Sequence, residues 1–199
     1  EVFKGGVKEM LSELDDSKVL PLHYAVASYY LKVFEFFFSL YEQNFSKEQI
    51  LEFITAKDSD GNSFLHHAAE YSKSEEVLKF AWTKIENLII DTKKFKEFLL
   101  MKNNSGKNAL MLSIKNEYTL MVSNLFKIEN SFCFLFEQVY CKFFNFKQIA
   151  YETDDDGENL LHLLAKCDSV PILELALEKL KNAFSHEVLQ NFFNLKNKK

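Results

Sequence analysis

The stretch from Asp58 to Ala69 constrains the fold of this chain more than any other. It begins with Asp-Ser-Asp-Gly-Asn-Ser, where short polar side chains can bond their own backbone and the glycine accepts a positive φ, so it predicts a turn. Apolar residues at helical spacing, Leu65, Ala68 and Ala69, predict a helix directly after the turn. Because alanine leaves little side chain between two backbones, this helix is expected to pack closely against another helix.

Weaker copies of this stretch recur along the chain. The signatures occupy positions 20–26, 61–69, 106–114 and 157–165. Aligned on His23, His66, Met111 and His162, they lie 43, 45 and 51 residues apart. A recurring period of this length is typical of stacked supersecondary units. The sequence therefore predicts one repeat array over positions 1–199.

The signature resembles that of the ankyrin repeat family, Asp-x-x-Gly-x-Thr-Pro-Leu-His-x-Ala-Ala. In the second copy the matching residues are Gly61, Ser63, Leu65, His66, Ala68 and Ala69, and in the first they are Pro21, Leu22, His23 and Ala25. The third copy departs most, with Met111 in place of the histidine. The resemblance implies an all-α, ankyrin-like solenoid of helix-turn-helix units. It also implies that each signature imidazole bonds the backbone of its turn and fixes the loop.

The repeat is longer than the roughly 33 residues usual for that family, which predicts an extra short third helix in each unit. Ser46 followed by Gln49 forms a capping box, and Ser46 lies 20 residues before His66. Asp91 lies 20 residues before Met111, so it is expected to cap the corresponding helix. A similar opening at Ser185 places the next signature beyond the last residue, and we therefore expect the chain to be part of a longer array.

Composition limits the classes of partner. The net charge of −5 argues against nucleic acid and anionic membranes, which attract clustered positive charge. No apolar run reaches the roughly 18 residues of a membrane span, so no membrane insertion is expected. Cys133, Cys141 and Cys167 show neither an even count nor a metal-ligand spacing, which favours free thiols in a reducing compartment. We therefore expect an intracellular, cytoplasmic location, or the interior of a host cell for a secreted effector.

No motif indicates catalysis, so we expect neither an enzyme nor a cofactor. The chain has no Ser-His-Asp order, no glycine-rich phosphate loop and no zinc spacing. The acidic run from Asp154 to Asp156 precedes Gly157 as in a calcium-binding EF-hand loop, but Leu163 occupies the position that needs a bidentate glutamate. An acidic loop tip is the better interpretation.

Resemblance to the family implies protein binding through the loop tips and the exposed ends of the inner helices. In the second unit the implied residues are Asp58, Ser59, Asp60, Asn62, His67, Glu70 and Tyr71. In the third they are Asn104, Lys107, Leu112 and Lys115, and in the fourth Asp155, Asp156, Glu158, Leu163 and Lys166. His67 is expected to point away from its turn and to be free for a partner. The acidic second and fourth tips predict a partner with basic groups.

Two other functions remain open from the sequence. The array could be the targeting arm of a larger host-directed bacterial effector or toxin whose catalytic domain lies outside this chain. It could also be a structural array that associates with itself through the aromatic segment from Phe132 to Phe146. That segment either packs back on its own array or forms a docking face, because so much aromatic surface needs a cover.

Overall fold

The structure, a computed structural model, describes residues 6–72, 74–115 and 146–166 together with 170, 173–174, 177–178 and 181. The described residues form ten helices and no strand, so this part of the chain is all-α. The helices are α1 (Val7–Ser12), α2 (Pro21–Val26), α3 (Leu31–Asn44), α4 (Lys47–Thr55), α5 (Phe64–Tyr71), α6 (Glu75–Leu88), α7 (Thr92–Leu99), α8 (Ala109–Lys115), α11 (Phe146–Ala150) and α12 (Leu160–Ala165). None of the described helices is long and apolar enough to cross a membrane.

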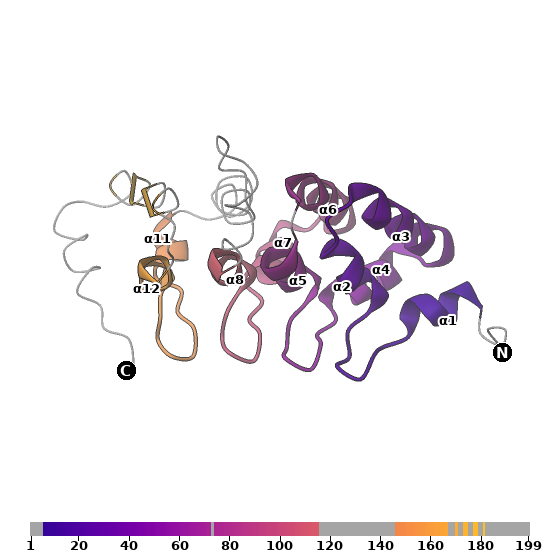
Figure 1. Ribbon diagram of the computed structural model, residues 1–199, viewed down its shortest axis with the longest axis horizontal. Helices are drawn as coiled ribbons and strands as arrows, with labels where there is room; N and C mark the ends of the chain where they lie inside the picture. Colours follow the sequence, from indigo (N-terminus) through magenta and orange to yellow (C-terminus); the bar gives the residue numbers. More distant parts are fainter. Residues whose placement is uncertain are drawn as a thin grey trace.

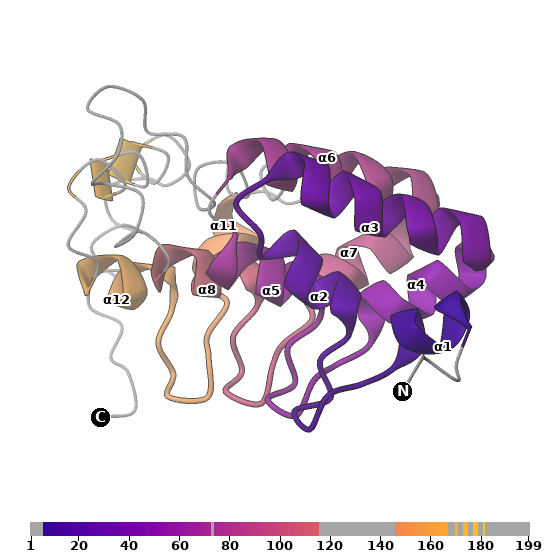
Figure 2. The same ribbon diagram turned by 45° about the vertical axis from the view of Figure 1, so that its right-hand side comes forward.

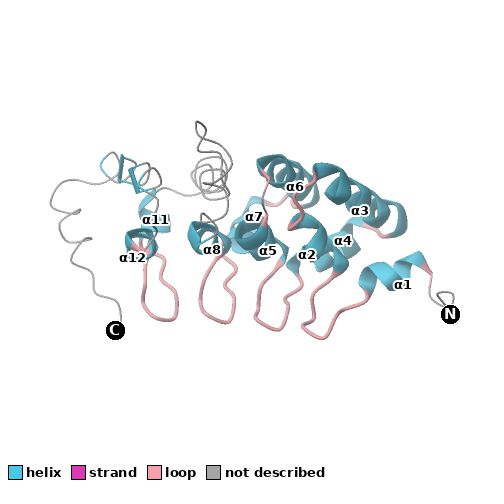
Figure 3. Cartoon of the chain, in the orientation of Figure 1, coloured by secondary structure: helices cyan, strands magenta, loops and turns pink. Residues whose placement is uncertain are grey.

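The short helices α2, α5, α8 and α12 form one row, in which each packs on the next (Figure 1). The loops that precede these helices all project to the same side of the row (Figure 3). The long helices α3 and α6 pack on each other and lie on the opposite side of the row from the loops (Figure 2). Helix α4 follows α3 and packs on α5 and α6, and α7 follows α6. The order of a short, a long and another short helix therefore occurs twice in succession.

The positions predicted for the helix starts are confirmed. Helix α4 begins after Ser46, whose Oγ accepts from the Gln49 N–H at 3.3 Å while the Ser46 N–H donates to Gln49 Oε1 at 3.0 Å. Helix α7 begins after Asp91, whose Oδ1 accepts from the Lys94 N–H at 2.8 Å. The row helices α5, α8 and α12 begin directly after the predicted residues Ser63, Asn108 and Asn159.

One predicted cap is wrong by two residues. Ser72 followed by Glu75 has the spacing of a capping box, which predicts Ser72 as the cap of α6. The capping residue is instead Ser74, whose Oγ accepts from the Val77 N–H at 3.4 Å. Ser72 instead ends α5, because its N–H still bonds the Ala68 carbonyl at 3.2 Å. The aromatic segment at 132–146 and the helix expected from position 185 lie outside the described residues, apart from the backbone of 146.

The hydrophobic core joins the first two units through Phe34. Its side chain is fully buried, and its ring centroid lies 6.0 Å from that of Phe64 and 5.7 Å from that of Phe80. Trp82 is also buried and meets Phe95 edge to face at 5.2 Å, as expected for a packing residue. On α3, the side away from Phe34 is not covered by described residues, as the 60% exposure of Phe36 shows.

Candidate interaction surface

In each loop that precedes a row helix, the side chain of an Asp or Asn accepts backbone N–H groups of the same loop. In the second loop Asp58 Oδ1 accepts from the N–H groups of Asp60 and Asn62 at 2.9 and 2.8 Å. The backbone N–H of Asp58 donates to the Asn62 carbonyl at 2.9 Å, which closes a hairpin-like turn. Gly61 takes a φ of +78° within it, a conformation that favours glycine. The predicted turn is therefore an Asx turn with a required glycine.

The same bonds recur at the repeat spacing. Asp15, Asn103 and Asp154 occupy the position of Asp58, and each accepts a backbone N–H on Oδ1 from the residue four positions later at 2.8 to 3.0 Å. Gly106 and Gly157 take positive φ like Gly61, and in the first loop the matching residue is Lys18, with a φ of +60°. The sequence alignment on the histidines missed this anchor, although Asp or Asn recurs at 43, 45 and 51 residues.

The signature histidines tie the loops to the helices, which confirms the role implied by the resemblance. His66 Nδ1 accepts from the Ser63 N–H at 3.1 Å, and its Nε2–H donates to the Lys107 carbonyl of the next loop at 3.1 Å. His23 Nδ1 accepts from the Leu20 N–H, and His162 Nδ1 accepts from the Asn159 N–H, each at 3.2 Å. Burial lowers the pKa of His23 and of His66 to about 4.

Neighbouring loops are also bonded to each other. Asn104 donates from its backbone N–H to the Asp60 carbonyl and from Nδ2 to the Ser59 carbonyl, both at 2.9 Å. The loops lie so close that a Cβ added to Gly61 would stand 2.4 Å from Asn104 Oδ1. Lys57 Nζ donates to the Lys102 carbonyl at 2.6 Å, which adds a further bond between the same two loops. These bonds hold the loops as one preorganised surface.

A pocket of about 580 Å³ lies between the first two loops and the helices α2 and α5. It is lined by Ser17, Val19, Tyr24, Ala27, Asp58, Ser59, Asp60, Asn62, His67, Glu70 and Tyr71. All the binding residues implied for the second unit line it, so the structure brings that predicted set together. Sequence reasoning missed Tyr24, although it follows His23 as His67 follows His66 and so occupies the equivalent position. We call this cavity the loop pocket.

The loop pocket is acidic and partly aromatic. Its described ionisable lining residues are Asp58, Asp60, Glu70, His67 and two tyrosines. Tyr24 and Tyr71 are 60% and 46% exposed. The Tyr24 hydroxyl donates to Asp15 Oδ2 at 2.6 Å, which lowers the pKa of Asp15 and raises the pKa of Tyr24.

The expectation that His67 is free is wrong. It is only 7% exposed, and its Nε2–H donates to Asp58 Oδ2 at 2.8 Å. Its ring lies 4.9 Å from that of His23 and 5.6 Å from that of Tyr71. Asp58 therefore holds both its own turn and His67. Asp58 and Asn62 are buried as well, which leaves Ser59, Asp60 and Tyr71 as the exposed members of the predicted set and Glu70 half-buried.

Most predicted residues of the third unit are buried or contact a neighbouring loop. Lys107 is half-buried and its Nζ lies 3.2 Å from Asp154 Oδ2, while Leu112 is buried. Lys102 Nζ donates to the Thr153 carbonyl at 2.7 Å. Asn104 is exposed but donates to the second loop, and the side chain of Lys115 lies outside the described residues. The lysines of the third loop are therefore directed to the fourth loop.

In the fourth unit only part of the predicted acidic tip is exposed, because Asp154 is 4% exposed. Asp155 and Asp156 are exposed. Glu158 is buried and forms an ion pair with Lys166, and Leu163 is half-buried.

A scan against protein-family models finds no match to this chain, and a search of the curated proteins finds none either.

Proposed function

We propose that this chain is an ankyrin-like repeat array that binds another protein through its loop side. The observation that carries the proposal is the loop pocket, where exposed aromatic rings and carboxylates converge on a rigid frame. A binding site typically places a few convergent polar groups in a preformed concavity. The four Asx-anchored loops and the row of short helices support the likeness to the ankyrin family at the level of the repeat unit.

The partner contributes a positively charged side chain to the loop pocket. Asp60 and Glu70 supply negative charge to the lining of this pocket. The faces of Tyr24 and Tyr71 can hold a lysine or arginine by a cation–π contact. Such charges raise the association rate and fix the orientation of a partner more than they add affinity. The sequence predicts a basic partner, and we assign the basic group of that partner to the loop pocket.

Site-specific photo-cross-linking tests this proposal. A benzophenone amino acid at Tyr71 is expected to capture a partner from extract of the source cells, and an excess of an oligolysine peptide is expected to reduce the capture. The matched control carries the same group at Phe36, which is also exposed but does not line the pocket. Equal capture at both positions would show that the loop side is not selective.

A charge-reversed variant completes the test. Asp60→Lys with Glu70→Lys is expected to abolish the capture at Tyr71 and to leave the melting temperature nearly unchanged, because neither carboxylate is buried. Asp58 is unsuitable for this purpose, since its carboxylate closes the turn and bonds His67. Capture that persists in the double variant at low salt would refute the acidic pocket as the binding site.

A further inference from the structure

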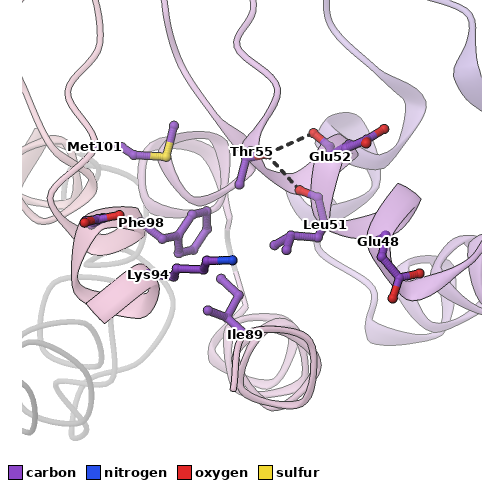
Figure 4. Close-up of a pocket in the computed structure, with 9 residues that line it drawn as sticks. Glu48, Leu51, Glu52, Thr55, Ile89, Lys94, Phe98 and Met101 are labelled. Carbon is purple, nitrogen blue, oxygen red and sulfur yellow. Dashed lines mark hydrogen bonds between the residues drawn. The ribbon is translucent and has the colours of Figure 1, made fainter. Parts of the chain in front are cut away.

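A second groove lies between α4 and α7, the additional short helices (Figure 4). Its volume is about 460 Å³, and it is lined by Glu48, Leu51, Glu52, Thr55, Ile89, Lys94, Glu97, Phe98 and Met101. None of these residues lines the loop pocket. We call it the α4–α7 groove.

The floor of the α4–α7 groove is apolar. Ile89 and Phe98 are buried beneath it, and Leu51 and Met101 are half-buried at its sides. The Lys94 side chain extends between Leu51 and Ile89 in Figure 4. Its aliphatic stem can cover an apolar floor while the ammonium stays in water. Thr55 Oγ1 donates to the Leu51 carbonyl at 2.8 Å, so the polar group of the wall is already satisfied within α4.

The rim carries more negative than positive charge. Glu48 and Glu52 are exposed one turn apart on α4, and neither makes an ion pair with another described residue. Like charges at this spacing disfavour a helix by a few tenths of a kcal/mol. Glu97 adds a third carboxylate from α7, although its Oε1 lies 4.0 Å from Lys93 Nζ. Lys94 is the only basic residue among the described residues of the lining. The backbone N–H of Glu48 at the N-terminus of α4 and the Ser46 hydroxyl stabilise the Glu48 carboxylate and lower its pKa. The rim as a whole still carries more carboxylates than ammonium groups, which complements a positively charged partner.

We propose that the α4–α7 groove docks an amphipathic helix of a partner protein, with a basic stripe beside its apolar face. Two walls built from helices and an apolar floor suit a helix that lays its apolar side chains between them. Lysines or arginines one turn apart on that helix face Glu48 and Glu52, which have the same spacing. This surface is additional to the loop pocket, so the chain presents two separate docking sites.

Fluorescence anisotropy with two synthetic helices tests the proposal on the full chain. The probe is a labelled amphipathic peptide of leucine and lysine, and its matched counterpart has glutamate in place of lysine. The leucine–lysine peptide is expected to bind, with an affinity that falls as salt rises, and the leucine–glutamate peptide is not. Glu48→Gln with Glu52→Gln is expected to weaken binding about five- to tenfold, the sum of two partly exposed charge pairs.

Two control variants locate the site. Glu9→Gln with Glu13→Gln removes another exposed glutamate pair of the same spacing, outside the groove, and is expected to leave the affinity unchanged. Asp60→Lys with Glu70→Lys disables the loop pocket and is also expected to leave it unchanged, so the two proposed sites fail independently. Equal binding of both peptides, or equal weakening by the Glu9/Glu13 variant, would overturn the proposal.

Discussion

Acidification is expected to destabilise this chain well above the range in which carboxylates titrate. His23 and His66 are fully buried, and burial lowers the pKa of each from 6.5 to about 4. Both are therefore neutral in the folded chain at pH 7 and remain so at pH 5. In the unfolded chain each imidazole takes up a proton near its ordinary pKa. Between these two pKa values the unfolded state binds more protons, so the free energy of unfolding decreases as the pH falls.

The size of the effect follows from the same two pKa values. Lowering the pKa from 6.5 to about 4 corresponds to a full contribution of about 3 kcal/mol per histidine, present above pH 6.5 and lost by about pH 4. At pH 5 about 2 kcal/mol of each contribution is lost, or about 4 kcal/mol for the pair. That is a large share of the roughly 5–15 kcal/mol by which domains are stable. Asp15, whose pKa is lowered from 3.8, acts only below this window.

Urea unfolding followed by circular dichroism between pH 7 and pH 5 measures this loss. His66→Gln keeps a donor for the Lys107 carbonyl but cannot titrate, so its stability is expected to depend less steeply on pH by about one proton, whatever its absolute stability. NMR titration of the His66 ring in the folded chain gives an independent value. A free energy of unfolding that is constant between pH 7 and pH 5 would refute the reasoning.

Three substitutions and one control variant test the packing and the backbone of the turns. Gly61→Ala is expected to cost at least about 1–2 kcal/mol in urea unfolding, because its φ is +78° and the Cβ would strike Asn104, whereas Gly6→Ala, with open space around it, should be nearly neutral. Phe34→Ala is expected to cost about 3–5 kcal/mol, and an unchanged midpoint would contradict its central place in the core. Lys18→Gly relieves a φ of +60° and should raise the melting temperature by a degree or more; a fall would show that the turn needs lysine.

Local chemistry explains why the helix starts could be predicted. Ser46 with Gln49, and Asp91 with the Lys94 N–H, form their caps within four residues, so nothing distant decides them. The glycines of the second, third and fourth turns are predictable for the same reason, because their positive φ is a property of the turn alone. The Ser72 cap was misplaced because Ser72 and Ser74 are both good caps, and the end of α5 decides between them.

The character of the binding surface could not be predicted in the same way. His67 is buried because the Asp58 carboxylate, which also closes the turn, lies 2.8 Å from its ring nitrogen. Lys102 bonds the Thr153 carbonyl across 51 residues of sequence, so its charge is not available at its own loop tip. The first outcome depends on a contact between the loop and the helix of one unit, and the second on a contact between units. A charge map drawn along the sequence contains neither contact, because it treats each loop tip as isolated.

If the proposed function holds, the residue after His23, His66, Met111 and His162 indicates which units can bind a polar partner. The histidine and the alanines of the signature are occupied in holding loops and packing helices, so the next position is freer to vary between units. It is Tyr24 in the first unit and His67 in the second, but Leu112 and Leu163 in the third and fourth. The polar aromatic side chains at this position therefore occur only in the first two units, where they line the loop pocket. A positively charged anchor of the partner is thus expected at the loops of α2 and α5, and the loops of α8 and α12 are expected to contribute orientation through Asp155 and Asp156.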